Sequence, residues 1–310
     1  EIASIYRGEA DRPTTRGPLQ QPGVDVRIGD ILQKVDGLDI RSPRDLSDAL
    51  MMKAGEEVLL ELRRGRETIQ EIVVPRTLWS TRPLHYLDWV ERNRDRVADA
   101  SDNSVGYLHM RAMGSSDAAS FARDFFEHFD KDGLIIDVRG NSGGNIDSMI
   151  LSTLMRQAWA YWRNPNHGNA YTNMQQTFRG HLVVLINEGT YSDGETFAAG
   201  VKALDLGTTI GTQTAGAGIW LSDRNGLADG GQARVAEYAQ YGADGRWLIE
   251  GRGVSPDVLV VNLPRATYDG SDAQLDYALS FLDEKISAEP IPELVPQQLP
   301  ALGESGKDVD

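Results

Sequence analysis

The sequence contains no cysteine, so neither a disulfide framework nor a thiol nucleophile is available to it. This absence is compatible with either a reducing or an oxidising compartment. No uninterrupted apolar run reaches transmembrane length, and we therefore expect no membrane insertion. The five histidines form no HExxH and no other pairing typical of zinc, so we expect neither a metal nor a cofactor.

Basic residues are scarce relative to acidic ones. The chain has 31 Lys and Arg against 46 Asp and Glu, which gives a formal net charge of −15 at pH 7. Because nucleic-acid phosphates require a basic surface, this balance argues against a nucleic-acid partner. The 310 residues, 40% of them hydrophobic, are enough for a sizeable core and favour two domains.

One serine lies at a sharp predicted strand-to-helix turn within LVVLINEGTYSDG, residues 182–194. Residues 182–186 are an apolar run typical of a buried strand, and 195–206 carry apolar residues at helical spacing. Ser192 would project from this turn, where the following backbone N–H groups open a helix and favour a developing oxyanion. A nucleophile fits this geometry, although Ser-Asp-Gly before a helix is also typical of an ordinary N-cap or turn.

A second predicted buried strand, residues 133–138, ends in the glycine-rich turn RGNSGGN, residues 139–145. Apolar residues at helical spacing follow from Ile146 to Trp159. Glycines let the backbone approach a ligand closely, so the turn could direct N–H groups at an anion or an oxyanion. A nucleotide phosphate loop is disfavoured, because no Gly-x-Gly-x-x-Gly and no Gly-Lys-Ser/Thr completes it.

Five segments in order resemble the tail-specific serine peptidases, and within them the tricorn-type core proteases. They are GYLHM at 106–110, DGLIIDVRGNSGGN at 132–145, LVVLINEGTYSDGETF at 182–197, IGTQTAGAG at 210–218 and GVSPDVLV at 253–260. The resemblance implies an α/β fold with a ClpP/crotonase-like serine peptidase domain, preceded by a small PDZ-like β/α domain. It also implies that the substrate is a peptide or unfolded polypeptide and that the protein is a homo-oligomer.

The resemblance further implies the site residues. Ser192 would be the nucleophile, and the N–H groups of Gly143 and Asp193 would form the oxyanion hole, with Gly144 replacing Gly143 if the register differs by one. Glu250 matches the glutamate that in the tricorn branch orients a catalytic histidine together with a second serine. The alternative for Glu250 is a surface carboxylate paired with a neighbouring arginine, Arg246 or Arg252.

Another branch of the family uses lysine as the base. After Ser192 the chain has only three lysines, and none lies in residues 212–217, where that branch carries its base. Lys202 lies ten residues along the following helix, about 15 Å away at about 1.5 Å per residue, which is too far for proton transfer. We therefore expect the histidine mechanism.

No histidine in the chain matches the tricorn-type base, and we expect structural or solvated roles for all five: His85, His109, His128, His167 and His181. In the tricorn type a Ser-His pair precedes the PDZ segment, whereas this chain starts with Glu1 inside PDZ-like sequence and without an initiator Met. We therefore expect a larger polypeptide that supplies the base. We expect the cytoplasm, with the periplasm as the alternative because a signal peptide would lie in the missing N-terminus.

We expect four parts: a PDZ-like domain at 1–76, truncated at its N-terminus, a linker at 77–83, the peptidase domain at 84–288 and a tail at 289–310. The first domain is predicted from a strand at 2–6, a helix at 44–52 and a hairpin of strands 58–62 and 68–74. Its carboxylate-binding loop would lie upstream of Glu1, so a packing or gating role competes with peptide binding. The polar segment 163–176 is expected to be a loop at the rim of the substrate pocket.

Three classes of function follow. The leading one is a serine endopeptidase that acts through an acyl-enzyme on Ser192. The second is a catalytically silent, PDZ-bearing peptide-binding or scaffold protein of the same fold. The third, a crotonase-like acyl-transfer enzyme, would not explain the PDZ-like segment.

Overall fold

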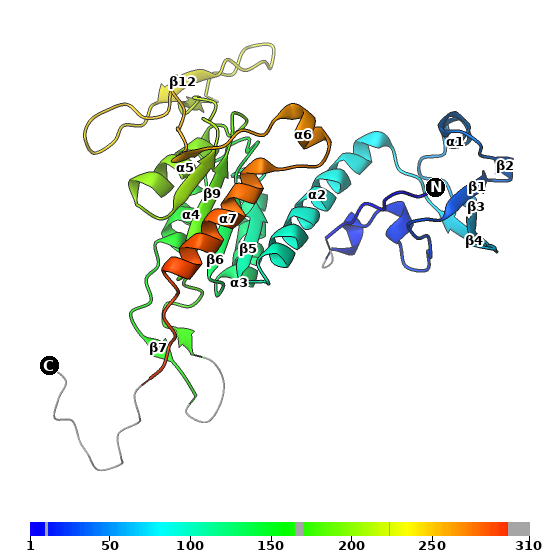
Figure 1. The fold of residues 1–310 in the computed structure, drawn as a ribbon. Helices are drawn as coiled ribbons and strands as arrows, with labels where there is room; N and C mark the ends of the chain where they lie inside the picture. Colours follow the sequence, from blue (N-terminus) through cyan, green and yellow to red (C-terminus); the bar gives the residue numbers. More distant parts are fainter. Residues whose placement is uncertain (10–11, 165–169, 223, 297–310) are drawn as a thin grey trace. The chain divides into compact units, whose positions relative to one another are not determined.

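The computed structural model describes residues 1–9, 12–164, 170–222 and 224–296. The chain divides into two compact units (Figure 1). In the sequence, the first unit ends at Arg96 and the second begins at Val97. Each unit has its own β-sheet and its own hydrophobic core.

The first unit contains a four-stranded antiparallel sheet in the order β2-β1-β3-β4. Its elements are two 3₁₀ turns at Pro13–Thr15 and Pro18–Gln20, β1 (Ile31–Val35), β2 (Leu38–Asp39), α1 (Pro43–Ala49), β3 (Val58–Arg64) and β4 (Glu67–Val73). Alternate residues of β3 point to one face of the sheet, and Val58, Leu60 and Leu62 accordingly form the core with Val35 and Val73. The helix and hairpin predicted from the sequence are both present.

Two predictions for this unit differ from the structure. Residues 2–6, predicted as a strand, form none, because only Ile2 shares backbone hydrogen bonds with the 29–30 turn and Tyr6 then stacks on His85 at 4.2 Å. Most of the expected linker 77–83 is helical, since α2 (Leu78–Ala100) begins there. The Thr77 hydroxyl accepts a 3.2 Å hydrogen bond from the Ser80 N–H and so caps this helix.

The second unit is built on a five-stranded parallel sheet in the order β13-β10-β9-β6-β5. Its strands are β5 (Val105–His109), β6 (Gly133–Asp137), β9 (His181–Ile186), β10 (Thr208–Gly211) and β13 (Val258–Leu259). The central strands β6 and β9 are buried on both faces, as their unbroken apolar runs predict. This mixed α/β architecture with a parallel sheet agrees with the predicted fold class.

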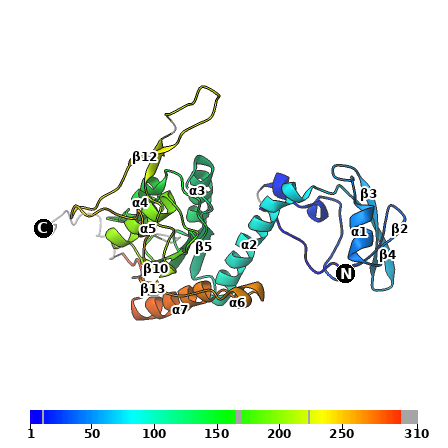
Figure 2. The same cartoon turned by 90° about the horizontal axis from the view of Figure 1, so that it is seen from above.

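Helices cover both faces of this sheet (Figure 2). One core contains strand residues such as Ile136 and Val184 together with apolar residues of α3 (Ser115–His128), α4 (Asp147–Leu154) and α5 (Asp193–Ala203). On the opposite face lies α7 (Ala273–Ala288), which follows the short α6 (Pro264–Tyr268). The helix predicted to run from 146 to 159 ends at Leu154, and Trp159 lies beyond it and is exposed.

Two small hairpins complete the unit: β7 (Tyr161–Trp162) with β8 (Tyr171–Thr172), and β11 (Trp220–Ser222) with β12 (Val235–Tyr238). The predicted rim loop 163–176 therefore includes β8, and its residues 165–169 lie outside the described residues, as do 297–310 of the predicted tail. Of the helices that the structure describes, none combines the length and apolarity needed to cross a membrane.

The parallel sheet decides where a site can form. Because β6, β9 and β10 run side by side in the same direction, the loops that leave their carboxyl ends meet at one edge of the sheet. These loops are residues 138–146, 187–192 and 212–219. The first two contain the glycine-rich turn and the serine turn that the sequence singles out.

Candidate active site

Ser192 lies at the tip of the turn between β9 and α5, in a strained backbone conformation. Its φ of 54° and ψ of −120° place it at positive φ, which residues other than glycine seldom adopt. The turn is tightened by backbone hydrogen bonds from Thr190 to Asn187 (2.8 Å) and from Gly194 to Tyr191 (3.1 Å). A serine held in this way at the end of a buried parallel strand has the geometry of a nucleophile elbow.

The carboxylate of Glu195 stabilises this turn by hydrogen bonds. It accepts hydrogen bonds from the Ser192 N–H (3.0 Å), the Thr214 hydroxyl (2.6 Å), the Gly216 N–H (2.6 Å) and the Ala217 N–H (2.9 Å). Glu195 is fully buried. It therefore links the serine turn after β9 to the loop after β10. Sequence analysis missed this role, although Ser-x-x-Glu is the signature of a capping box.

Asn141 plays the corresponding part in the glycine-rich turn. Its side-chain amide donates to the Met110 carbonyl at 2.7 Å, and its backbone carbonyl accepts from the Tyr191 N–H at 2.8 Å. Its side-chain oxygen accepts the Gly143 N–H at 2.8 Å. The turn is thus tied to the residue before Ser192, and the Gly143 amide, our first choice for the oxyanion hole, is already engaged.

Gly143 is nevertheless in direct contact with the serine. Its φ is +86°, and a Cβ placed on it would lie 2.6 Å from Ser192 Cβ and 3.0 Å from Ser192 Oγ. A separation below 3.0 Å is a steric clash, so both the backbone angle and the space require glycine here. The glycine allows the two turns to approach one another.

Two backbone amides at this edge remain unpaired. Neither the Gly144 N–H nor the Asp193 N–H has a hydrogen-bond partner among the described residues. Asp193 is the first residue of α5, where amides have no partner within the helix. Met113 holds the two neighbours of Gly144. Its N–H donates to the Gly143 carbonyl and its carbonyl accepts from the Asn145 N–H, both at 2.8 Å.

These groups border a cavity of about 370 Å³. Its lining comprises the serine and both residues with free amides, together with polar and aromatic residues of the β11–β12 hairpin and of α4 and α5: Gly144, Asn145, Asp147, Ser192, Asp193, Thr196, Gly218, Trp220, Tyr238 and Gln240. Of the expected rim segment 163–176, the residues that the structure describes, 163–164 and 170–176, contribute none of them. A concave site with a serine and two unsatisfied donors is suited to binding a carbonyl group.

The Asp193 side chain turns toward the beginning of α4. Its Oδ2 accepts the N–H groups of Ile146 (2.8 Å) and Asp147 (3.1 Å). Burial, together with the negative charge of Asp147, raises the pKa of Asp193 to about 6. The raised pKa thus belongs to a residue that itself lines the cavity.

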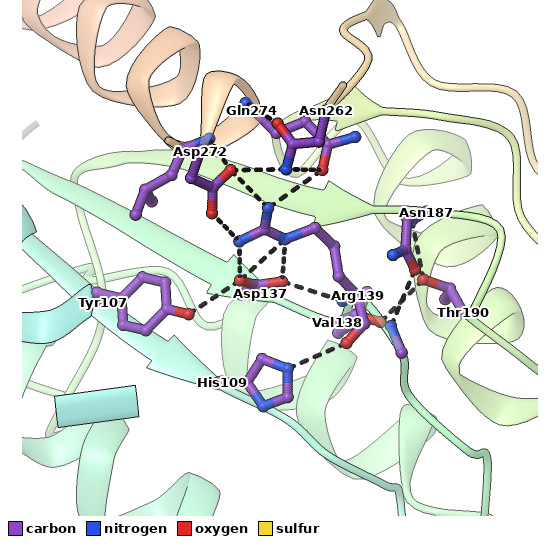
Figure 3. A network of polar contacts seen from close by, with 12 residues as sticks. Tyr107, His109, Asp137, Val138, Arg139, Asn187, Thr190, Asn262, Asp272 and Gln274 are labelled. Atoms are coloured by element: carbon purple, nitrogen blue, oxygen red, sulfur yellow. Dashed lines mark hydrogen bonds and ion pairs between the residues drawn. The ribbon is translucent and has the colours of Figure 1, made fainter. Parts of the chain in front are cut away.

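A buried ion pair anchors the glycine-rich turn at the end of β6 (Figure 3). The Arg139 guanidinium donates to Asp137 at 2.6 Å and to Asp272 at 2.8 Å, and the Tyr107 hydroxyl donates to Asp137 at 2.9 Å. Burial alone would raise the pKa of Asp137, but the charge and hydrogen bonds of Arg139 outweigh it and keep this pKa below its ordinary value. The pair fixes the starting point of the turn that carries Gly143 and Gly144.

A second set of bonds in Figure 3 joins this turn to the serine turn. The Thr190 hydroxyl donates to the Val138 carbonyl at 2.8 Å, and the Asn187 side chain accepts the Gly140 N–H at 2.9 Å. His109 forms a 3.0 Å hydrogen bond with the Arg139 carbonyl, and burial lowers its pKa. His109 is thus part of the support of the turn.

Glu250 lies on the loop beside the cavity. Its Oε2 accepts the Ile219 N–H at 2.9 Å, so it is held next to Gly218, which lines the cavity, while its side chain stays exposed. The neighbouring Arg246 pairs with Asp244 at 2.6 Å.

None of the four described histidines lines the cavity. His85 stacks on Tyr6, His109 contacts Arg139, His128 is buried at the end of α3 and His181 bonds the Glu289 carbonyl at 2.8 Å. His167 lies outside the described residues. Within the described ranges no cluster of three or more potential ligands is arranged to hold a metal ion.

Comparison with protein families decides the affiliation. The family model described as "Peptidase family S41" matches residues 104–260, which contain β5 to β13 and the cavity, and the "Tricorn protease PDZ domain" model matches residues 1–77. The chain belongs to peptidase family S41. Its predicted relation to the tricorn-type proteases is therefore confirmed.

Individual relatives agree with this family. The tricorn protease of Thermoplasma acidophilum is 30% identical to this chain, over 92% of this chain and 26% of the relative. Tricorn protease homolog 1 of Streptomyces coelicolor is 33% identical, over 96% of this chain and 28% of the relative. The crystal structure of the tricorn protease superposes with a TM-score of 0.82 at 30% identity, covering 92% of this chain and 28% of that one. The chain spans only about a quarter of the length of these relatives.

Proposed function

We propose that this S41 chain carries the nucleophile and oxyanion hole of a serine peptidase that hydrolyses peptides or unfolded polypeptides. The observation that supports it most strongly is the strained turn that presents Ser192 beside two unpaired backbone amides in one cavity. In this reaction the Ser192 oxygen bonds to the scissile carbonyl carbon and gives its proton to a base. The base then protonates the leaving amine, and water hydrolyses the acyl-enzyme.

The oxyanion hole in this proposal consists of the N–H groups of Asp193 and Gly144. Gly144 is preferred to Gly143 because the Gly143 amide already donates to Asn141. The Asp193 amide also lies at the N-terminus of α5, whose partial positive charge favours an oxyanion. Gly143 would then serve by its lack of a side chain, which allows close approach to Ser192.

The base in this proposal is a histidine supplied by polypeptide outside residues 1–310. Support comes from the described histidines, each of which has contacts away from the cavity. Lys202 is an unsuitable base, because its ammonium group pairs with Asp257 at 2.6 Å and donates to the Ser255 carbonyl at 2.7 Å. Glu250, beside the cavity, would orient the incoming histidine.

The test is hydrolysis of a fluorogenic peptide library by the intact protein, by its Ser192→Ala variant and by residues 1–310 alone. We expect turnover by the intact protein only, and restored turnover when the upstream segment is added to residues 1–310. Without a positioned base, the remaining acceleration would be about 10³ to 10⁴ over water, below the reach of a routine assay.

Three results would contradict the proposal. Activity of the intact Ser192→Ala variant would exclude Ser192 as the nucleophile. Ser192-dependent turnover by residues 1–310 alone would place the base within this chain. An intact protein that binds peptides but never cleaves them would favour the silent scaffold.

A further inference from the structure

We propose that the Asp193 side chain is a positioning residue of the oxyanion hole: its carboxylate fixes the segment that carries the Gly144 amide relative to Ser192. This inference rests on the proposed function. It assigns the side chain of Asp193 a role separate from that of its backbone N–H. One residue would then supply the first oxyanion donor and hold the second in place.

The first observation is that α4 does not cap itself. Its N-cap residue is Ile146, whose side chain cannot accept a hydrogen bond. The missing acceptor comes from the neighbouring helix, because Asp193 Oδ2 accepts the Ile146 and Asp147 amides at 2.8 and 3.1 Å. Asp193 is almost fully buried, so water competes little for these bonds.

The second observation is that the Gly144 amide lies between two anchors. On one side the Met113 backbone holds residues 143 and 145 through two 2.8 Å hydrogen bonds, so close that a Cβ on Gly144 would lie 1.9 Å from the Met113 carbonyl oxygen. On the other side Asp193 holds residues 146 and 147. Only the Asp193 anchor belongs to the same turn as Ser192.

This arrangement connects helix capping to catalysis. An oxyanion hole acts through donors placed at hydrogen-bond distance from the developing charge, and a shift of about 1 Å can cost about 10²-fold in rate. Without its carboxylate anchor, the 144–147 segment would lose its direct hydrogen bonds to the serine turn, and the link between Tyr191 and Asn141 would hold the Gly144 amide less closely. The Gly144 donor would then be lost mainly in the transition state, which lowers kcat more than it raises KM.

The experiment compares Asp193→Ala, Asp193→Asn and the parent in the intact protein, by kcat and KM for a peptide and by the affinity of a peptide boronate, whose tetrahedral adduct occupies the oxyanion hole. We expect Asp193→Ala to lose about 10- to 100-fold in kcat, less than the loss of a whole donor, with KM within about threefold. Boronate affinity should fall in parallel. Asp193→Asn keeps an acceptor oxygen and should retain kcat within about threefold.

The control is Asp45→Ala, which removes a carboxylate that accepts the Arg41 N–H at 2.9 Å at the start of α1. Its kcat should not change, although a carboxylate hydrogen bond beside the start of a helix is lost. If Asp193→Ala does not fold, Asp193→Ser, with a shorter acceptor, should show an intermediate loss of kcat, and an unchanged kcat would overturn the inference.

Two further outcomes would overturn it. One is an Asp193→Ala variant that keeps the parent kcat and boronate affinity while losing stability, which would make the side chain a helix cap only. The other is an Asp193→Asn variant as impaired as Asp193→Ala. Both differ from failure of the proposed function, in which Ser192→Ala would remain active.

Discussion

The backbone N–H of Ser192 donates a 3.0 Å hydrogen bond to the buried carboxylate of Glu195, which lies three residues later in the first turn of α5. The same carboxylate accepts the Gly216 and Ala217 amides of the loop after β10. One side chain therefore holds both the turn of the candidate nucleophile and the loop that leads to Gly218 in the cavity lining. This arrangement offsets the strain of a serine at positive φ.

Replacement of Glu195 tests this arrangement. In Glu195→Gln one carboxylate oxygen is replaced by an NH₂ group. This group is a donor, and it would face N–H and O–H groups that donate hydrogen bonds to the carboxylate in the parent. We expect the free energy of unfolding to fall by about 2–4 kcal/mol, since several hydrogen bonds to a charged group are lost in a buried site. Urea unfolding measures it, with the exposed Glu284→Gln as the control. Equal stability of the two variants would contradict the structural role of Glu195.

Two glycines of one turn separate crowding from backbone strain. Gly143 and Gly140 both have positive φ, but a Cβ on Gly143 clashes with Ser192, whereas a Cβ on Gly140 meets nothing within 4 Å. We expect Gly143→Ala to reduce kcat/KM at least about 100-fold, because displacing the serine disturbs near-attack geometry. Gly140→Ala should lose about 1 kcal/mol of stability and keep most activity. Similar activity losses in both variants would show that backbone strain, and not contact with Ser192, causes the loss of activity.

Lys202 provides a test of the base. Its ammonium group is engaged by Asp257 and the Ser255 carbonyl, at 2.6 and 2.7 Å. We therefore expect Lys202→Ala to keep kcat/KM within about threefold, since the loss of a partly exposed ion pair costs at most about 1 kcal/mol. Peptide hydrolysis by the folded variant measures it. A loss of several orders of magnitude in kcat/KM would instead indicate that Lys202 is the base.

The raised pKa of Asp193 predicts a pH-dependent stability. Its folded value of about 6 exceeds the ordinary 3.8, so the folded state holds the proton more tightly, and this contribution is complete below pH 3.8 and is lost as the pH rises through 6. Asp193→Asn cannot ionise. We therefore expect its stability relative to the parent to increase from pH 4.5 to pH 7.5 in urea unfolding. A difference that stays constant or decreases would contradict the shifted pKa.

Much of this site could be predicted from local sequence. The apolar runs before 139 and before 187 predict buried parallel strands, and the turn residues after them place Ser192 at the sheet edge. The strand predicted at 2–6 was wrong because its partners are a distant turn and a histidine of α2, which no local pattern reveals.

Which glycine amide of the 139–145 turn has no hydrogen-bond partner could not be predicted for the same reason. Whether the Gly143 or the Gly144 amide is free depends on Asn141, which takes the Gly143 N–H, and on Met113, from another strand end. The link from Glu195 to residues 214–217 also joins two separate loops. Such bonds become visible only when the loops are placed together in space.

The identity of the nucleophile is tested most directly by covalent labelling. The intact protein is treated with a fluorophosphonate and digested, and mass spectrometry identifies the modified peptide. The controls are Ser192→Ala and Ser222→Ala, the latter at a buried serine outside the cavity lining. We expect a single adduct on Ser192, with loss of peptide hydrolysis in proportion to labelling, no adduct in Ser192→Ala and unchanged labelling in Ser222→Ala. An intact protein that hydrolyses peptides while Ser192 stays unmodified, or that is labelled equally in Ser192→Ala, would contradict the account.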